Sequence, residues 1–269
     1  MKPQLGHAAR AFPTLLKVGM AEMFAYRAEF FIWILTTNLP LVMMALWTAV
    51  AAEGAVGRFD SKTFQAYYLA TLMIRLLTNT WMVWQLTMDI RQGALATRLL
   101  RPLHPLLAYA AEHMAAVPIR AVMVSPLLIV LVVVTPGHLA LGSPLRLGIF
   151  LTSLVGAWLL LFFMMAIVGS LALYVESAVG IFEVWLGLHS ILSGYLVPLE
   201  LMPDWVRAIS NTLPFRYSLG FPVETMIGLN TEVQALRDLG VQWLYVVALL
   251  AATLAVWRKG MRRFVAFGG

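Results

Sequence analysis

The chain of 269 residues contains no cysteine, and charged residues make up only 12% of it. The missing cysteines exclude disulfide bonds, thiol catalysis and cysteine metal sites. Soluble domains carry about twice this share of charged residues. Apolar residues account for 61% of the chain, and its mean hydropathy is +0.83. The composition therefore indicates an integral membrane protein.

Two motifs that carry chemistry in other proteins are also missing. The sequence has no Gly-x-x-x-x-Gly-Lys phosphate loop, so we do not expect the chain itself to bind ATP. Its five histidines are scattered, without the His-x-x-x-His or Glu-x-x-His spacing that places metal ligands on one helical face. We therefore expect neither catalysis nor a metal site in this chain.

The net charge of +6 comes from basic residues that lie at the ends of apolar runs rather than along one solvated face. This distribution is typical of residues that fix membrane topology and contact lipid. We therefore expect membrane lipid as a partner and no nucleic acid.

Six apolar runs predict an all-α membrane protein with six transmembrane helices. Residues 1–28 are amphipathic and predict a cytoplasmic interfacial helix. The six-span domain then covers 29–258, and a basic cytoplasmic tail covers 259–269. The predicted spans are 30–52, 64–87, 116–135, 145–174, 178–197 and 241–257.

An even number of spans puts both termini on one side of the membrane. Lysine and arginine are concentrated near the N-terminus, in 89–105 and in the tail. Because cytoplasmic loops carry the excess of these residues, we expect these three regions to be cytoplasmic.

The segment 89–101 is basic and compatible with a helix, and two prolines follow it. At about 100° per residue, Arg91, Arg98 and Arg101 fall within a wedge of about 80°. Such a cationic face can contact lipid phosphates or a protein partner. The alternative is a basic loop that only fixes the topology.

The second span carries a polar face that includes Arg75, with Asn79 beside it. An arginine near the middle of the membrane costs about 2.5–3.5 kcal/mol, so it needs a partner or water. We predict that this face turns toward protein or a wet cavity. Arg75 is then either a cation lining a cavity or part of a structural ion pair inside the bundle.

The fifth span carries a stripe of small and acidic residues, which favours close packing of helices in lipid. We predict a helix-packing or subunit interface there. Glu183 and His189 offer an alternative, a proton relay. The stripe consists of Glu176, Gly180, Glu183, Gly187, Ser190 and Gly194.

The region 198–238 alternates prolines with aromatic and apolar residues. Segments this apolar and this short predict a re-entrant helical hairpin on the extracytoplasmic side, before the last span.

The order of these elements resembles the permease subunits of type-2 ABC exporters over nearly the whole chain. In particular, the chain resembles a bacterial branch in which two different permeases often accompany one ATPase. The similar motifs are Arg91-Gln92-Gly93-Ala94-Leu95, Leu99-Leu100-Arg101-Pro102-Leu103, Ser193-Gly194 with Pro198, Pro203-Asp204-Trp205 and Leu213-Pro214-Phe215.

The resemblance implies a non-catalytic permease in the bacterial cytoplasmic membrane, where the helix at 89–101 couples to a separate ATP-binding subunit present in two copies. That subunit would bind ATP and Mg, and a second permease would complete a homodimer or heterodimer. The implied contacts with the ATPase are Arg91, Gln92, Gly93, Arg98, Arg101 and Glu176, with Gly180, Glu183, Gly187, Ser190 and Gly194 at the permease interface.

Arg75 and Asn79 would face the translocation path of such an exporter. Composition favours a lipid, a hydrophobic drug or a peptide as cargo, and leaves polysaccharide open. The rival hypothesis is an ion-coupled secondary transporter or channel that uses Arg75, Glu183 and His189. The sequence lacks the matching halves with interrupted spans that are typical of inverted repeats, which disfavours this rival.

Overall fold

The computed structural model describes residues 39–175 and 178–264, together with the single residue 14. The predicted interfacial helix at 1–28, Glu176 and the end of the tail lie outside these ranges, except for residue 14. Within them the chain is helical, with one isolated bridge between Val56 and Phe59 and no strand. The prediction of an all-α protein is therefore confirmed for the described residues.

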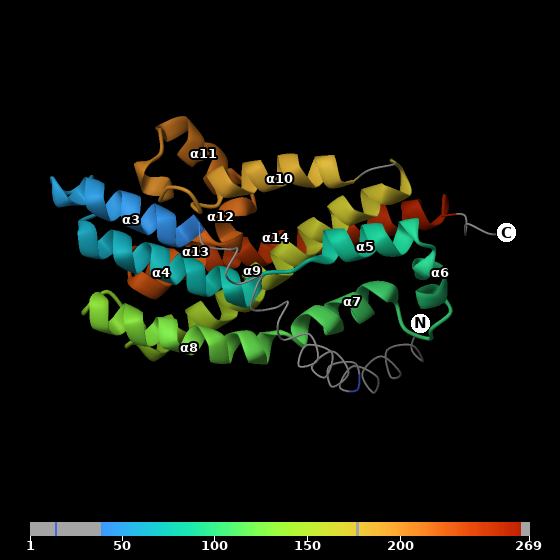
Figure 1. Cartoon of the computed structure of the whole chain (residues 1–269), viewed down its shortest axis with the longest axis horizontal. Coiled ribbons are helices and arrows are strands. Elements are labelled where there is room, and N and C mark those ends of the chain that lie inside the picture. The colour runs from blue at the N-terminus through green and yellow to red at the C-terminus, as the bar shows by residue number, and fades with distance from the viewer. Residues whose placement is uncertain (1–13, 15–38, 176–177, 265–269) are drawn as a thin grey trace.

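The described helices form an elongated bundle (Figure 1). At its centre, α9 packs against α14 along most of their lengths. The helices are α3 Leu39–Ala52, α4 Ser61–Thr78, α5 Met82–Arg91, α6 Ala94–Leu99, α7 Pro105–Met114, α8 Val117–Val134, α9 Pro144–Ser170, α10 Val179–Leu192, α11 Asp204–Thr212, α12 Phe215–Ser218, α13 Gly220–Ile227 and α14 Glu232–Met261, with 3-10 turns η1 Leu171–Leu173 and η2 Leu199–Leu201.

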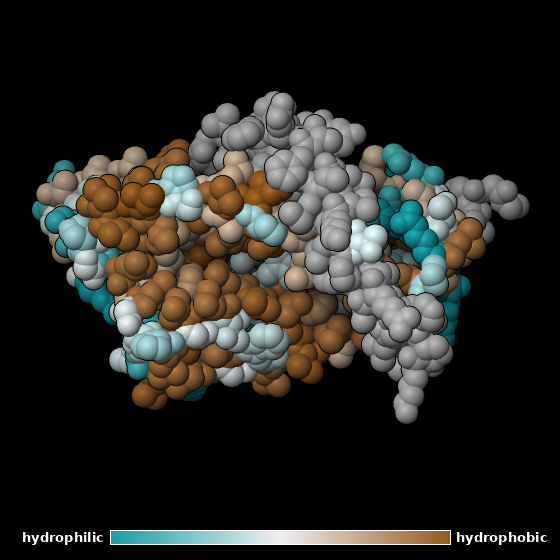
Figure 2. All heavy atoms as spheres, turned by 90° about the horizontal axis from the view of Figure 1, so that it is seen from below, coloured by the Kyte–Doolittle hydropathy of each residue, from teal (hydrophilic) through white to brown (hydrophobic). Residues whose placement is uncertain are grey.

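Three helical stretches of 30 residues each are long and apolar enough to cross a membrane: Pro105–Val134, Pro144–Leu173 and Glu232–Met261. Thirty residues of α-helix extend about 45 Å, more than the hydrocarbon core of about 30 Å. Hydrophobic side chains cover much of the described surface between the ends of the bundle, and hydrophilic ones gather toward both ends (Figure 2). The protein is therefore a multi-pass membrane protein.

The α9–α14 contact is close because Gly156 has no side chain. A Cβ atom added at Gly156 would lie 2.6 Å from the side chain of Gln242. The buried Gln242 Nε2 donates to the carbonyls of Ser153 and Tyr217, at 2.9 and 2.8 Å. This amide therefore joins α14 to both α9 and α12 in the core.

Several predicted span boundaries were wrong. The run 64–87 is two helices, because α4 ends at Thr78 and Asn79 is extended. The third predicted span, 116–135, corresponds to α8, and α7 extends this apolar stretch back to Pro105 across a turn at 115–116. The last helix begins at Glu232, since Thr231 and Gln234 form a capping box that starts it nine residues before the predicted span.

The region 198–238 contains four short helical segments and the start of α14, grouped at the end of the bundle opposite α6 (Figure 1). Arg216 on α12 forms ion pairs with Glu224 on α13, at 2.6 Å, and Asp238 on α14, at 2.9 Å. These side chains are 14–17% exposed. The ion pairs therefore fix the short helices against the last long one.

Candidate functional site

A sharp turn at one end of the bundle connects α5 to α7. We call the connecting segment 92–104 the elbow; it contains the six-residue helix α6. Gly93 begins α6 with a φ of 74°, in the left-handed region that glycine adopts without a Cβ clash. The predicted single helix at 89–101 is therefore divided at Gly93, and its residues do not share one helical face.

Arg98 on α6 lies at the centre of an internal ion network. Its Nε is 2.7 Å from Asp89 Oδ2, and its Nη1 is 2.6 Å from Glu112 Oε1. The guanidinium also lies over the ring of Tyr109, at 4.4 Å from the centroid. Tyr109 Oη and Gln85 Nε2 donate to Asp89 and Glu112, each at 2.6 Å. Helices α5, α6 and α7 are thus joined by charged hydrogen bonds.

This network changes the predicted role of Arg98. Its side chain is only 18% exposed. Burial alone would lower the pKa of Arg98, but its hydrogen bond to Glu112 and the charges of Glu112 and Asp89 raise this pKa above the ordinary arginine value. Arg98 is therefore a charged residue that holds the elbow from inside, and its interactions are directed away from the surface.

Other predicted residues of the elbow region face outward. Arg91, Gln92 and Arg101 are exposed, and Leu100 is 87% exposed. Leu95 on α6, by contrast, is fully buried. The end of α5 and the elbow thus present Arg91 and Arg101 beside an exposed apolar residue, Leu100.

Arg75 and Asn79 lie together in a second place, near the middle of the bundle. They line a pocket of about 50 Å³ with residues of α9, α10 and α12, among them His189 and Ser218. We call this the arginine pocket. Arg75 Cζ lies 4.3 Å from the centroid of the Tyr195 ring, and the His189 Nε2 atom lies 3.0 Å from Ser218 Oγ. The pocket brings together three residues that were singled out from the sequence.

The sequence interpretation missed Arg120, which is 6% exposed on α8. Its Nη1 donates to the main-chain carbonyl of Asn79, where α4 ends. The sequence does contain a signal for this residue, because Arg120 is a lone basic residue inside a predicted apolar span. Its position could not be read from the sequence, because the break after Thr78 that frees this carbonyl was itself not predicted.

The predicted stripe on the fifth span separates into two groups. Gly180, Glu183 and Gly187 are exposed on α10, and a Cβ atom added at either glycine would meet nothing within 4 Å. Ser190 is half-buried. Gly194 lies beyond the end of α10 in a buried turn, where its carbonyl accepts a hydrogen bond from the Tyr67 hydroxyl at 2.7 Å. Gly194 therefore does not belong to the exposed face.

The two residues of the predicted proton relay are also separated. His189 faces the arginine pocket, whereas Glu183 lies on the exposed side of α10. Six helical positions place them on different faces of that helix.

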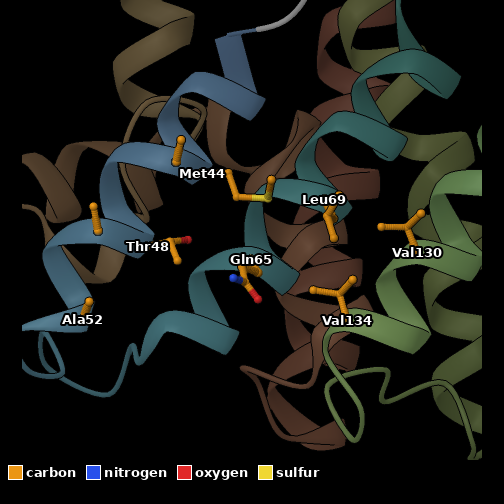
Figure 3. Close-up of a pocket in the computed structure, with 9 residues that line it drawn as sticks. Met44, Thr48, Ala52, Gln65, Leu69, Val130 and Val134 are labelled. Atoms are coloured by element: carbon orange, nitrogen blue, oxygen red, sulfur yellow. The ribbon is translucent and has the colours of Figure 1, made fainter.

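An apolar groove of about 460 Å³ lies between α3, α4 and α8 (Figure 3). Met44, Thr48 and Ala52 line one side, and Gln65 with Val134 lie across from them. None of the predicted site residues lines this groove. Its apolar walls suit contact with lipid chains.

The family model described as "ABC-2 family transporter protein" matches residues 37–268, which is most of the chain. The chain belongs to the ABC-2 transporter family. It is therefore a permease subunit of an ABC transporter, and membership implies partnership with an ABC ATP-binding subunit. No curated protein and no solved structure is significantly similar to this ABC-2 permease.

Proposed function

We propose that this ABC-2 permease is the six-span subunit of an ATP-driven exporter in the bacterial cytoplasmic membrane, with both termini in the cytoplasm. In this assignment α3, α4 with α5, α7 with α8, α9, α10 and α14 belong to the six spans. The observation that carries the proposal is the elbow, an internally braced turn that presents Leu100 and Arg101 at one end of the bundle, beside the exposed Arg91 at the end of α5.

The elbow has the properties required of a docking element for an ATPase. The exposed Arg101 of the elbow and the adjacent Arg91 of α5 suit an acidic groove, and Leu100 supplies an exposed apolar anchor. Arg98 makes the elbow stiff by joining it to α5 and α7. A displacement of the elbow is therefore transmitted to α5. The other end of α5 lies close to Asn79, where α4 ends beside the arginine pocket. ATP and Mg would be bound by the two copies of the ATPase, and this chain supplies the path.

Pairing of two permeases is the second part of the proposal. Glu183 and the exposed apolar residues Ile181, Val184 and Leu188 share α10 with the two open glycines. A carboxylate that faces hydrocarbon is costly, whereas one at a protein interface finds polar partners. The pairing of α10 with a second permease, as a homodimer or heterodimer, accounts for this combination.

Replacing Gly187 by leucine is expected to weaken permease pairing about tenfold or more. Overpacking a close contact costs about 1–3 kcal/mol, while the isolated chain has open space at this position. Co-purification of differently tagged permeases measures the effect. Gly148→Leu is the matched control, because Gly148 is also an exposed helical glycine with open space around its Cβ position. Equal pairing of both variants would assign the α10 face to lipid.

Reversing the charges of two exposed arginines at the elbow end of the bundle tests whether this end binds the ATPase. The double change Arg91→Glu and Arg101→Glu is expected to weaken ATPase binding roughly a hundredfold, because like charges across an interface cost several kcal/mol. Affinity purification of the complex and permease-stimulated ATP hydrolysis measure the effect. Lys62→Glu with Arg237→Glu changes the net charge equally at the opposite end and should leave both unchanged. Normal binding by the first double variant would remove the elbow from the interface.

The rival function, an ion-coupled transporter, rests on Arg75, Glu183 and His189 acting together. The separation of Glu183 from the arginine pocket disfavours a relay through these three groups. The cargo of the exporter is proposed to be an amphiphile, such as a lipid, a hydrophobic drug or a peptide, in keeping with the largely apolar bundle.

A further inference from the structure

Arg75 is a cation inside the membrane domain, and none of the carboxylates in the described part of the chain pairs with it. The ring of Tyr195 lies under its guanidinium, with the centroid 4.3 Å from Cζ. No ion pair joins Arg75 to a carboxylate in residues 39–175 and 178–264. Arginines within membrane spans usually pair with an acid or line a wet cavity, because their charge is costly in hydrocarbon. Arg75 is therefore balanced by something other than the described acids.

The pocket around Arg75 offers donors of hydrogen bonds as well as positive charge. Asn79 Nδ2 is buried and has no hydrogen-bond partner among the described residues. The carbonyl of Asn79 is already occupied by Arg120, which places a second guanidinium close to the same break. His189 and Ser218 bond to each other at the opposite side. A buried donor without a partner is costly, so this site is built for an acceptor.

The shape of the pocket favours a small polar group attached to an apolar body. Its volume of about 50 Å³ accommodates only a few atoms or water molecules. Leu161, Met165 and Leu219 form apolar walls, and Trp185 and Leu186 border it on α10. Leu186 is itself exposed, so the pocket borders the helix assigned above to permease pairing. A group that moved along the proposed permease interface would pass beside this pocket.

We propose that the arginine pocket binds the acidic head group of an anionic amphiphile, a phosphate or carboxylate attached to an apolar chain, and that this class of molecule is the cargo. The proposal rests on the proposed function, since the pocket is useful for transport only if the chain lines an export path. Arg75 supplies the charge, and Asn79 Nδ2 supplies a directed hydrogen bond. The apolar walls receive the first part of the chain.

The test is binding of dodecyl phosphate to the full-length permease, purified with its ATPase in a neutral detergent. Dodecyl phosphate is expected to raise the Tm of the wild-type complex by several degrees, in a saturable manner. Dodecyltrimethylammonium at the same concentration, which has the same chain and the opposite charge, should not. Inorganic phosphate, which has no apolar chain, distinguishes binding of an amphiphile's head group from binding of a small free anion. A Tm shift as large with inorganic phosphate would overturn the amphiphile in favour of a small free anion.

Variants of the pocket locate the effect. Arg75→Gln should weaken dodecyl phosphate binding at least tenfold, whereas Arg75→Lys should retain most of it. Asn79→Asp is nearly the same size and places a carboxylate beside Arg75, so it should abolish binding while the folded protein stays intact. Arg146→Gln is the control, because Arg146 donates to the Asn230 carbonyl at 2.9 Å and does not line the pocket.

Unchanged binding by both Arg75→Gln and Asn79→Asp would overturn the proposal, as would an equal Tm shift with the cationic detergent. ATPase co-purification, measured on the same preparations, distinguishes failure of the head-group site from failure of the exporter assignment. If the wild-type permease forms the ATPase complex but does not bind dodecyl phosphate, only the head-group site is refuted. Failure of the wild-type permease to associate with the ATPase refutes the exporter assignment.

Discussion

Replacing Arg98 by glutamine is expected to lower the free energy of unfolding of the permease by about 3 kcal/mol and to abolish ATPase binding. The change leaves Asp89 and Glu112 half-buried without their cation. Removing one member of a buried ion pair costs about 3–5 kcal/mol, and we expect the lower end because these side chains remain 15–24% exposed. Thermal or denaturant unfolding of the permease without its ATPase measures the effect.

Stability and ATPase binding, measured separately, distinguish an internal structural role of Arg98 from direct contact with the ATPase. If Arg98 acts only by touching the ATPase, Arg98→Gln will bind poorly but unfold like the wild type, and the internal role fails. Arg98→Lys keeps the charge but not the forked geometry that reaches both acids, so it should be intermediate. Arg207→Gln is a control, because Arg207 and Asp204 form an exposed ion pair worth less than about 1 kcal/mol.

The all-helical fold and the presence of apolar helices long enough to cross a membrane could be predicted from the sequence, because long apolar runs follow directly from the physics of the bilayer. The structure places the basic segment 89–101 at the end of α5 and in the turn that leads to α7. Its internal geometry was not predicted, since Gly93 takes a left-handed conformation that divides the predicted helix. A helical wheel drawn through 89–101 therefore grouped Arg98 with Arg91 and Arg101, although its guanidinium is held internally.

The polar face of the second run was predicted to meet protein or a cavity, and Arg75 and Asn79 do line one pocket. The sequence left open an internal ion pair for Arg75, but its recorded contact is an aromatic ring. Long-range contacts decide such outcomes. Tyr195 is 120 positions away from Arg75, and Arg120 reaches Asn79 from another helix. Periodicity within one run contains no information about these partners.

The second large effect is expected from covalent capture of the elbow. Because the chain has no cysteine, Leu100→Cys creates a single labelling site on the most exposed apolar side chain of the elbow. A photoreactive maleimide attached to this site before assembly reports whichever protein lies next to it. Val233→Cys is the matched control, since Val233 is 78% exposed in the first turn of α14, at the opposite end of the bundle (Figure 1).

Illumination of the complete complex in native membranes is the most direct test of the claim that the elbow receives the force of ATP hydrolysis. The account predicts a covalent product between the position 100 label and the ATP-binding subunit, a change in its yield when ATP is added, and no such product from position 233. An intact complex in which position 100 gives no ATPase product, or in which both positions give the same yield, would contradict it.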